Sequence, residues 1–268
     1  MPELPEVETT VRGLERVLAG RRIARVEARR ADLRHAFPHD LGQRLTGAKV
    51  TKLGRRAKYG LIDTDRGDTM IFHLGMSGSW RIDHARLEKH DHLLLETEEG
   101  TRLSLNDPRR FGSVDLVPTA ELDQWPAFAA LGPEPLEMPA EELKRRLAGR
   151  KAAIKLLLLD QRIVAGLGNI YVCEALHRAG IHPSRAGGSL SLERLKRLVQ
   201  AIRAVLDEAI AAGGSTLRDF ASPDGELGYF SKTFAVYDRE GKPCACGGGV
   251  KRIVQGGRST FYCPKCQH

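Results

Sequence analysis

The first twenty residues carry apolar side chains at helical spacing. Pro5 fits the first turn of a helix, where its missing N–H would have no partner, and Gly20 offers a stop at the other end. Between them the apolar positions share one face, which predicts a helix over residues 5–19. These positions are Val7, Val11, Leu14, Val17 and Leu18.

From about residue 22 to residue 117 the pattern changes to short apolar runs separated by turn residues. The runs are IARV, KVTKL, YGLID, MIFHL, SWRI, HLLLE, RLSL and SVDLV. Eight short runs at this spacing predict strands in a sandwich or barrel-like pair of sheets.

The segment LGPEPLEMP (131–139) holds three prolines and a glycine, which predicts a linker. Helical patterns follow it at 140–148, 151–162, 169–178 and 191–212. Strands followed by helices predict an α+β fold in two domains. The expected boundaries are 1–130 for a catalytic β-sandwich domain, 131–139 for the linker, 140–233 for a helical domain and 234–268 for a cysteine-bearing end. Residues 213–233 lack a clear period, and a loop of that length is typically functional or mobile.

The charge balance favours an anionic partner. The net charge is +8, the sequence pI is about 9.4, and no Asp or Glu follows Glu240. A basic patch is typical of nucleic-acid binding, although a merely basic enzyme has the same balance. No apolar run approaches the length of a membrane span and no secretion signal is evident, so we expect a cytoplasmic protein.

Four cysteines near the end of the chain predict a metal site. They are arranged as Cys244-x-Cys246 and Cys263-x-x-Cys266, and two such pairs on hairpin turns supply the four thiolates of one structural Zn²⁺. The first pair is one residue shorter than the usual spacing. Cys173 lies in an apolar helical pattern and is expected to be a small buried side chain.

The N-terminus is a candidate nucleophile. Met1 precedes a small residue and is expected to be removed, so that Pro2 presents a secondary amine. An α-amine has a pKa of about 8 and is partly unprotonated near neutrality. Glu3 is next to that amine and Glu6 lies one helical turn further on, so one carboxyl can serve as an acid and the other can position the amine. The same Pro and Glu spacing is also typical of a plain helix start.

Nine ordered blocks make the chain resemble the formamidopyrimidine-DNA glycosylase family. The blocks are MPELPEVETT (1–10), RRAKYG (55–60), HLGMSGS (73–79), KHDH (89–92), NDPRRFG (106–112), LGPEPL (131–136), GLGNIYVCEAL (166–176), GGSTLRDF (213–220) and GGRSTFYCPKCQ (256–267). The resemblance implies an N-terminal helix with an antiparallel β-sandwich, then a helical domain with a helix-two-turns-helix motif and a zinc ribbon. It also implies duplex DNA as the partner.

The same resemblance implies roles for single residues. Pro2 corresponds to the Schiff-base nucleophile and Glu3 to the general acid, while Glu6 keeps the positioning role that its spacing suggests. Lys58 corresponds to a lysine that assists β-elimination, and Arg258, after two glycines at the ribbon tip, to an arginine that assists δ-elimination. Further DNA-binding positions are His73, His90, Arg109, Lys151 and Asn169. Met76, Arg109 and Phe111 correspond to the residues that fill the gap left by a flipped-out nucleotide.

Three functions stay open at this point. The first is a monomeric, bifunctional glycosylase and abasic-site lyase that removes oxidised purines, namely formamidopyrimidines and 8-oxoguanine, in base-excision repair. The second is an endonuclease VIII-like enzyme for oxidised pyrimidines, although the start MPELPEVET and the block NDPRRFG favour the first. The third is a noncatalytic DNA-binding protein with a zinc ribbon. Zn²⁺ is the one cofactor expected, because Schiff-base chemistry needs no other.

Overall fold

The computed structural model describes residues 2–84, 86–215 and 229–268. Met1 and most of the loop predicted at 213–233 therefore lie outside the described residues. The chain divides into two compact units. Unit 1 holds the described residues of Met1–Ala129 and Ala212–Tyr229, and unit 2 those of Ala130–Ala211 and Phe230–His268. The four ranges expected from the sequence stay a prediction.

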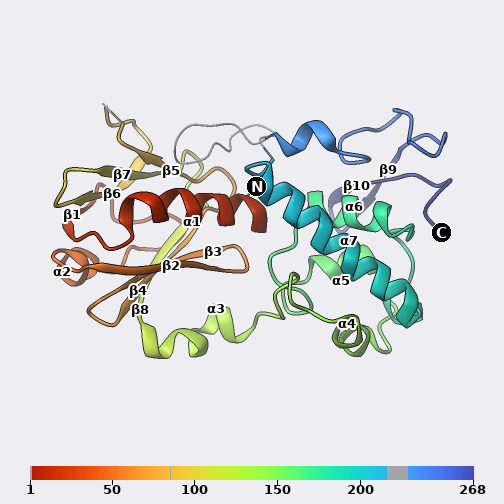
Figure 1. Cartoon of the computed structure of the whole chain (residues 1–268), viewed down its shortest axis with the longest axis horizontal. Helices are drawn as coiled ribbons and strands as arrows, with labels where there is room; N and C mark the ends of the chain where they lie inside the picture. The colour runs from red at the N-terminus through yellow and green to blue at the C-terminus, as the bar shows by residue number, and fades with distance from the viewer. Residues whose placement is uncertain (1, 85, 216–228) are drawn as a thin grey trace. The chain divides into compact units, whose positions relative to one another are not determined.

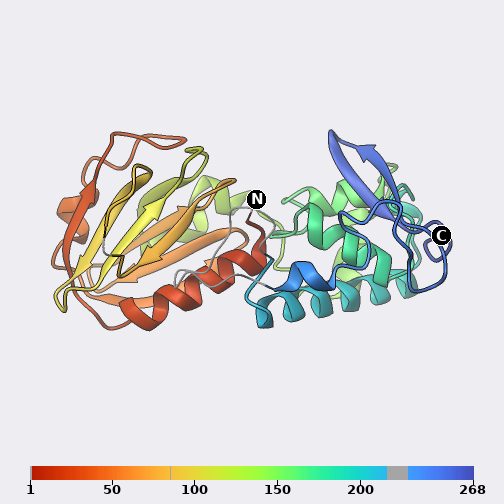
Figure 2. The ribbon, with the colours of Figure 1, turned by 90° about the horizontal axis from the view of Figure 1, so that it is seen from above.

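Unit 1 is a helix with two antiparallel sheets, as the sequence predicts (Figures 1 and 2). Its helices are α1 (Leu4–Leu18), α2 (Leu41–Leu45), the 3-10 helix η1 (Thr119–Gln124) and α3 (Pro126–Ala129). One sheet has the order β2-β3-β4-β8 and the other the order β1-β6-β7-β5. The strands are β1 (Ile23–Ala28), β2 (Val50–Arg56), β3 (Tyr59–Thr64), β4 (Asp68–His73), β5 (Ser79–Ile82), β6 (Asp91–Thr97), β7 (Arg102–Asn106) and β8 (Ser113–Pro118).

Apolar burial between the layers holds unit 1 together. Phe72 on β4 and Trp80 on β5 meet edge to face with ring centroids 5.6 Å apart, and both are buried. The apolar stripe of α1 joins the same core as Leu93 and Leu105 of the second sheet, and α1 contacts β2 and β3. The predicted helix face is therefore the face that packs. The packing of α1 therefore fixes the position of the N-terminal residues that precede the helix.

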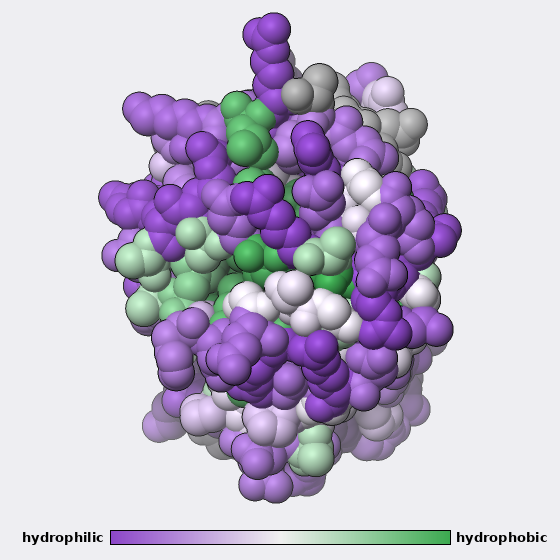
Figure 3. All heavy atoms as spheres, turned by 90° about the vertical axis from the view of Figure 1, so that its left-hand side faces the viewer, coloured by the Kyte–Doolittle hydropathy of each residue, from purple (hydrophilic) through white to green (hydrophobic). Residues whose placement is uncertain are grey.

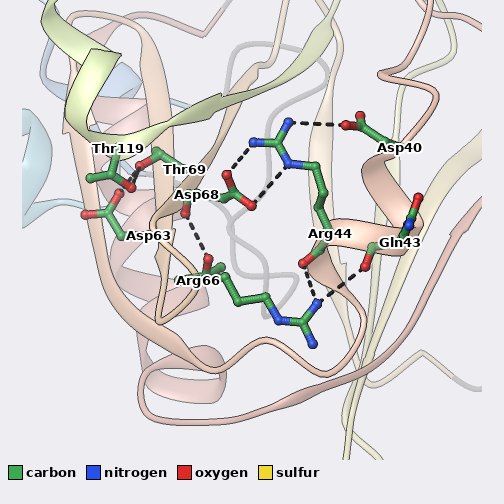
Figure 4. A network of polar contacts seen from close by, with 9 residues as sticks. Asp40, Gln43, Arg44, Asp63, Arg66, Asp68, Thr69 and Thr119 are labelled. Carbon is green, nitrogen blue, oxygen red and sulfur yellow. Dashed lines mark hydrogen bonds and ion pairs between the residues drawn. The ribbon is translucent and has the colours of Figure 1, made fainter.

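The short helix α2 is absent from the sequence prediction, and a polar network explains why it forms (Figure 4). Arg44 on α2 makes a two-point contact with the carboxylate of Asp68 on β4 and a further bond to Asp40. The partly buried Arg44 guanidinium is thus bonded to a strand 24 residues away. Five residues give too little periodic signal for prediction, because this helix depends on a tertiary contact.

Unit 2 is helical, with a two-stranded hairpin at its end. Figure 2 shows the hairpin on one side of α6 and the long α7 on the other. The helix predicted at 151–162 is shorter than expected, because Ala153 pairs with Ala186 as an extended bridge before the helix begins. The elements are α4 (Ala140–Leu147), α5 (Ile154–Leu159), α6 (Asn169–Arg178), η2 (Gly187–Ser189), α7 (Leu192–Ala211), η3 (Phe230–Thr233), β9 (Lys251–Gln255) and β10 (Arg258–Tyr262).

The outer surface of unit 1 is mainly hydrophilic at the end where α2 lies, with hydrophobic atoms gathered in a central hollow (Figure 3). Among the described residues, no helix combines the length and the apolar character needed to cross a membrane.

Candidate functional site

The start of α1 holds two buried carboxylates in fixed positions. Glu3 is the residue that caps the helix, and its side chain accepts the backbone N–H of Glu6. In return, Oε2 of Glu6 accepts the backbone N–H of Glu3 at 2.8 Å. Both side chains are 2% exposed. The helix-start interpretation and the catalytic one are therefore compatible, because the capping box fixes a carboxyl group beside Pro2.

The second oxygen of Glu6 reaches a residue that sequence reasoning missed. Oε1 accepts the backbone N–H of Ser215 at 2.8 Å and its hydroxyl at 3.0 Å. These two residues are 209 positions apart, and both are buried. Glu6 therefore connects the N-terminal segment to the start of the loop predicted at 213–233, within unit 1. No local signal could have indicated this contact.

Lys58 lies at the tip of the β2–β3 hairpin, in a two-residue turn between the paired residues Arg56 and Tyr59. The other turn residue, Ala57, has a φ of 53°, a left-handed conformation that is costly for alanine. Arg55 supports the turn, because its guanidinium donates to the Ala57 carbonyl at 2.9 Å and to Glu8 of α1 at 3.1 Å. The position of Lys58 is thus linked to α1.

His73 ends β4 as a neutral imidazole. Burial, together with the nearby positive charges of Lys58 and Arg34, lowers its pKa to about 4. Its Nδ1 lies 3.0 Å from the backbone nitrogen of Gly75 and accepts that N–H. The ring proton therefore resides on Nε2, where it can be donated to an anion such as a phosphate.

The structure brings the predicted gap-filling residues together on two loops of unit 1. The Met76 loop (residues 74–78) follows His73, and the Phe111 loop (residues 107–112) carries Arg109 and Phe111. The Arg109 guanidinium lies 4.8 Å from the centre of the Phe111 ring, which is 46% exposed. His90 lies in the turn before β6, with its ring 6.0 Å from that of His92.

In unit 2 the structure places Asn169 next to the hairpin that carries Arg258. Asn169 is the first residue of α6, and its side-chain amide donates to the carbonyl of Ser259 at 2.9 Å. Gly256 and Gly257 both have positive φ and form the tip before the exposed Arg258. Lys151 is exposed in the segment before α5.

The four cysteines fit one tetrahedral Zn²⁺. Their sulfurs all lie within 4.8 Å of one another, with 3.9 Å between Cys244 and Cys266 and 3.5 Å between Cys246 and Cys263. Thiolates at about 2.3 Å from one ion are about 3.8 Å apart. The short first pair is accommodated by Gly248, where a Cβ would lie 2.8 Å from the sulfur of Cys263.

Glu174 holds the beginning of the ribbon and is a second residue that sequence reasoning missed. It is buried on α6 and accepts the backbone N–H groups of Ala235, Val236 and Tyr237 at 2.8 to 3.0 Å. Its neighbour Cys173 is buried against the ribbon core, as expected for a structural cysteine. An acidic residue inside the apolar run IYVCEAL was the available signal.

Three family profiles match the chain in order. They are described as the formamidopyrimidine-DNA glycosylase N-terminal domain (residues 1–114), the formamidopyrimidine-DNA glycosylase H2TH domain (residues 131–221) and a zinc finger found in FPG and IleRS (residues 241–268). The last match covers the four cysteines. Together the matches span both units.

Full-length relatives carry the same family name. Formamidopyrimidine-DNA glycosylases of Novosphingobium aromaticivorans and Rhizorhabdus wittichii are 71% and 67% identical, and both alignments cover 100% of each chain. A Lactococcus lactis FPG mutant in complex with Fapy-dG DNA has a TM-score of 0.92 at 34% identity, with 100% of both chains covered. MutM (Fpg) of Thermus thermophilus has a TM-score of 0.89 at 40% identity, with 99% of this chain and 98% of that chain covered. The chain therefore belongs to the formamidopyrimidine-DNA glycosylase family.

Proposed function

We propose that this chain is a bifunctional DNA glycosylase and abasic-site lyase that removes oxidised purines from duplex DNA in base-excision repair. The observation that carries the proposal is the fixed carboxyl of Glu3 beside the N-terminal Pro2. Solved relatives in complex with Fapy-dG DNA and with abasic-site DNA support this substrate class. Family membership favours it over both the oxidised-pyrimidine enzyme and the noncatalytic DNA-binding protein.

In the proposed reaction the Pro2 amine, freed by removal of Met1, attacks C1′ of the damaged nucleotide. The bond between C1′ and the base breaks, and the base leaves with the electron pair and takes up a proton. Glu3 donates a proton to the sugar oxygen as the ring opens, which leaves a positively charged iminium on Pro2. Because proline is a secondary amine, that charge needs no further protonation. Glu6 positions the amine segment through its bond to the Glu3 backbone.

The iminium charge then acidifies C2′. Loss of a C2′ proton expels the 3′ phosphate in β-elimination, and a second elimination expels the 5′ phosphate. We assign Lys58 to the first step and Arg258 to the second, where each cation stabilises a departing phosphate. The bond from Arg55 supports the turn that carries Lys58. Bound Zn²⁺ supplies a structural link that folds the ribbon carrying Arg258.

We assign DNA contacts to two further groups. Phosphate contacts are assigned to His73 and Asn169, and further DNA contacts to His90 and Lys151. For His73, the proton on Nε2 supports a neutral donor role. Met76, Arg109 and Phe111 are assigned to the gap left by the flipped nucleotide, which an exposed aromatic ring beside an arginine is suited to fill. We also propose a monomer that acts in the bacterial cytoplasm on the nucleoid.

Borohydride trapping tests the proposal. The protein is incubated with duplexes that carry 8-oxoguanine, an oxidised pyrimidine or no lesion, and the covalent protein–DNA adduct is measured. We expect strong trapping on the 8-oxoguanine duplex and none on undamaged DNA. Pro2→Gly is expected to trap about tenfold less, because a glycine imine is charged only when protonated. Preferential trapping on the pyrimidine lesion would move the chain to the rival enzyme class, and no trapping on any duplex would refute an enzyme.

A further inference from the structure

Asp107 is a buried carboxylate without a role in the mechanism above. It follows β7 and begins the Phe111 loop, and it is 0% exposed. Its Oδ1 accepts the hydroxyl of Ser77 at 2.8 Å, and its Oδ2 accepts the backbone N–H of Gly112 at 2.8 Å. One carboxylate therefore binds the Met76 loop and closes the Phe111 loop on itself.

The backbone of Asp107 reaches a third segment. Its N–H donates to the carbonyl of His90 at 3.0 Å, and its carbonyl accepts the Nε2 proton of His92 at 3.1 Å. Asp107 is thus bonded to the segments that carry Met76, His90 and Phe111. These three segments come from different parts of the sequence, and each holds a residue that we assign to DNA.

The two loops also touch directly, which leaves little freedom between them. Ser77 uses its hydroxyl a second time, because its Oγ lies 3.3 Å from the backbone nitrogen of Arg109 and accepts that N–H. A Cβ on Gly75 would lie 2.3 Å from the carbonyl carbon of Phe111. The Met76 loop and the Phe111 loop therefore pack backbone against backbone.

The Phe111 loop requires such support because its backbone is strained. Arg110 has a φ of 56°, in the left-handed region that non-glycine residues rarely adopt. That conformation is sterically unfavourable for an L residue, so it persists where surrounding contacts impose it. Asp107 holds the backbone at Arg110 and just beyond it. Its carbonyl accepts the N–H of Arg110 at 3.2 Å, and its carboxylate accepts the N–H of Gly112.

We propose that Asp107 is the positioning residue of the gap-filling group, and that its carboxylate holds Met76, Arg109 and Phe111 in the arrangement needed to stabilise a flipped nucleotide. This inference rests on the proposed function. Extrusion of a base loses its stacking and pairing, and side chains fixed in advance recover more of that loss than side chains that must first be ordered. The carboxylate acts through the loops and does not touch the DNA.

Two substrates separate this role from general stability. Base excision is measured in single-turnover reactions on an 8-oxoguanine duplex, and strand cleavage is measured on a duplex with a preformed abasic site, which has no base to unstack. Asp107→Ala is expected to excise 8-oxoguanine about tenfold or more slowly, while abasic-site cleavage changes less than about threefold. Asp107→Asn keeps an oxygen for Gly112 and an amide for Ser77, so both rates are expected within about threefold of wild type.

Asp63→Ala provides the matched control. It removes a carboxylate of the same unit that accepts the Thr69 hydroxyl at 2.7 Å, away from the two loops, and is expected to show no selective loss. Equal loss on both substrates in Asp107→Ala would overturn the inference. So would an Asp107→Asn enzyme as impaired as Asp107→Ala, because the charge and not the geometry would then matter.

Ser77→Ala keeps the test decisive if Asp107→Ala does not fold. It removes one hydroxyl from the network and is expected to slow 8-oxoguanine excision about threefold without slowing abasic-site cleavage. If that variant showed no selective loss of 8-oxoguanine excision, the result would contradict the role of the carboxylate. A wild-type protein that excises no 8-oxoguanine would refute the proposed function itself, and this inference with it.

Discussion

The β-sandwich of unit 1 and the ribbon of unit 2 are held together by different forces. The sandwich encloses a continuous apolar core to which both sheets and α1 contribute. In the ribbon strands β9 and β10, Thr260 and Phe261 are the buried residues, and the small cluster around them includes Cys244 and Cys263. Apolar burial can fold the sandwich, whereas the ribbon depends on metal ligation and on the carboxylate of Glu174.

This difference matters because each region carries a residue assigned to one half of the chemistry. Pro2 and Lys58 belong to the sandwich unit, and Arg258 belongs to the ribbon. The first half of the reaction should therefore tolerate loss of the metal better than δ-elimination does. Four changes test this difference between the two units.

Loss of a zinc ligand should have the largest effect. Cys263→Ser is expected to release the metal and unfold the ribbon, because structural Zn²⁺ contributes about 10–16 kcal/mol in small zinc domains. Hydrogen exchange should show loss of protection over residues 251–262 while β2, β3 and β4 stay protected. Metal content is measured alongside.

Cys173→Ala is the control for this change, because Cys173 is buried in the same cluster but lies outside the four clustered sulfurs. It should retain one zinc per chain. Cys244→Ala and Cys246→Ala test the short pair in the same assay, and full zinc retention in either would exclude that cysteine from the ligand set.

Removal of the Glu174 carboxylate should have the next largest effect. Glu174→Ala leaves three backbone N–H groups without their acceptor, at a cost of about 1–3 kcal/mol each, so we expect unit 2 to lose at least about 3 kcal/mol. In Glu174→Gln, the stability of unit 2 should lie between that of Glu174→Ala and that of wild type. Chemical denaturation followed separately for each unit measures the loss, and an unchanged unit 2 would show that the metal alone holds the ribbon.

Acidification should weaken unit 1 through His73. The unfolded chain takes up this proton near pH 6.5 and the folded chain near pH 4, so the unfolded state binds more protons between these values. The contribution of His73 to stability is therefore full above pH 6.5 and falls as the pH drops towards 4, by at most about 3 kcal/mol. Urea unfolding at pH 7 and pH 5 measures it. His73→Asn, which keeps an acceptor for Gly75, should show a smaller pH dependence than wild type.

Relief of backbone strain at Ala57 should have the smallest effect. Ala57→Gly accommodates the φ of 53° without steric cost but adds entropy to the unfolded chain, so a net gain of about 0.5 kcal/mol is expected. Thermal unfolding measures it. A destabilised variant would mean that the buried Ala57 methyl group matters more than the strain.

The sequence alone predicted the elements that have strong periodic patterns. Helix α6 begins and ends where the pattern indicated, because Gly168 and Asn169 mark its start and its next seven residues are buried. Helix α2 was missed because it depends on Asp68, and the helix predicted at 151–162 proved shorter because residue 153 is held in a bridge. These departures arise from tertiary contacts.

The candidate site divides in the same way. Residues in recognisable motifs, such as Pro2 and Lys58, were named from the sequence. Residues that hold other parts of the site, such as Ser215 and Asp107, make contacts across 209 and 30 positions. A single sequence holds no signal for such pairs, because serine and aspartate at these positions are equally typical of ordinary turns.

The central claim is that the amine of Pro2 forms the covalent bond to the sugar. The most direct test reduces the adduct on an 8-oxoguanine duplex with borohydride, digests it with protease and nuclease, and locates the sugar remnant by mass spectrometry. We predict the remnant on the nitrogen of Pro2, in a peptide that lacks Met1. A remnant on Lys58 or on any other lysine would contradict the account.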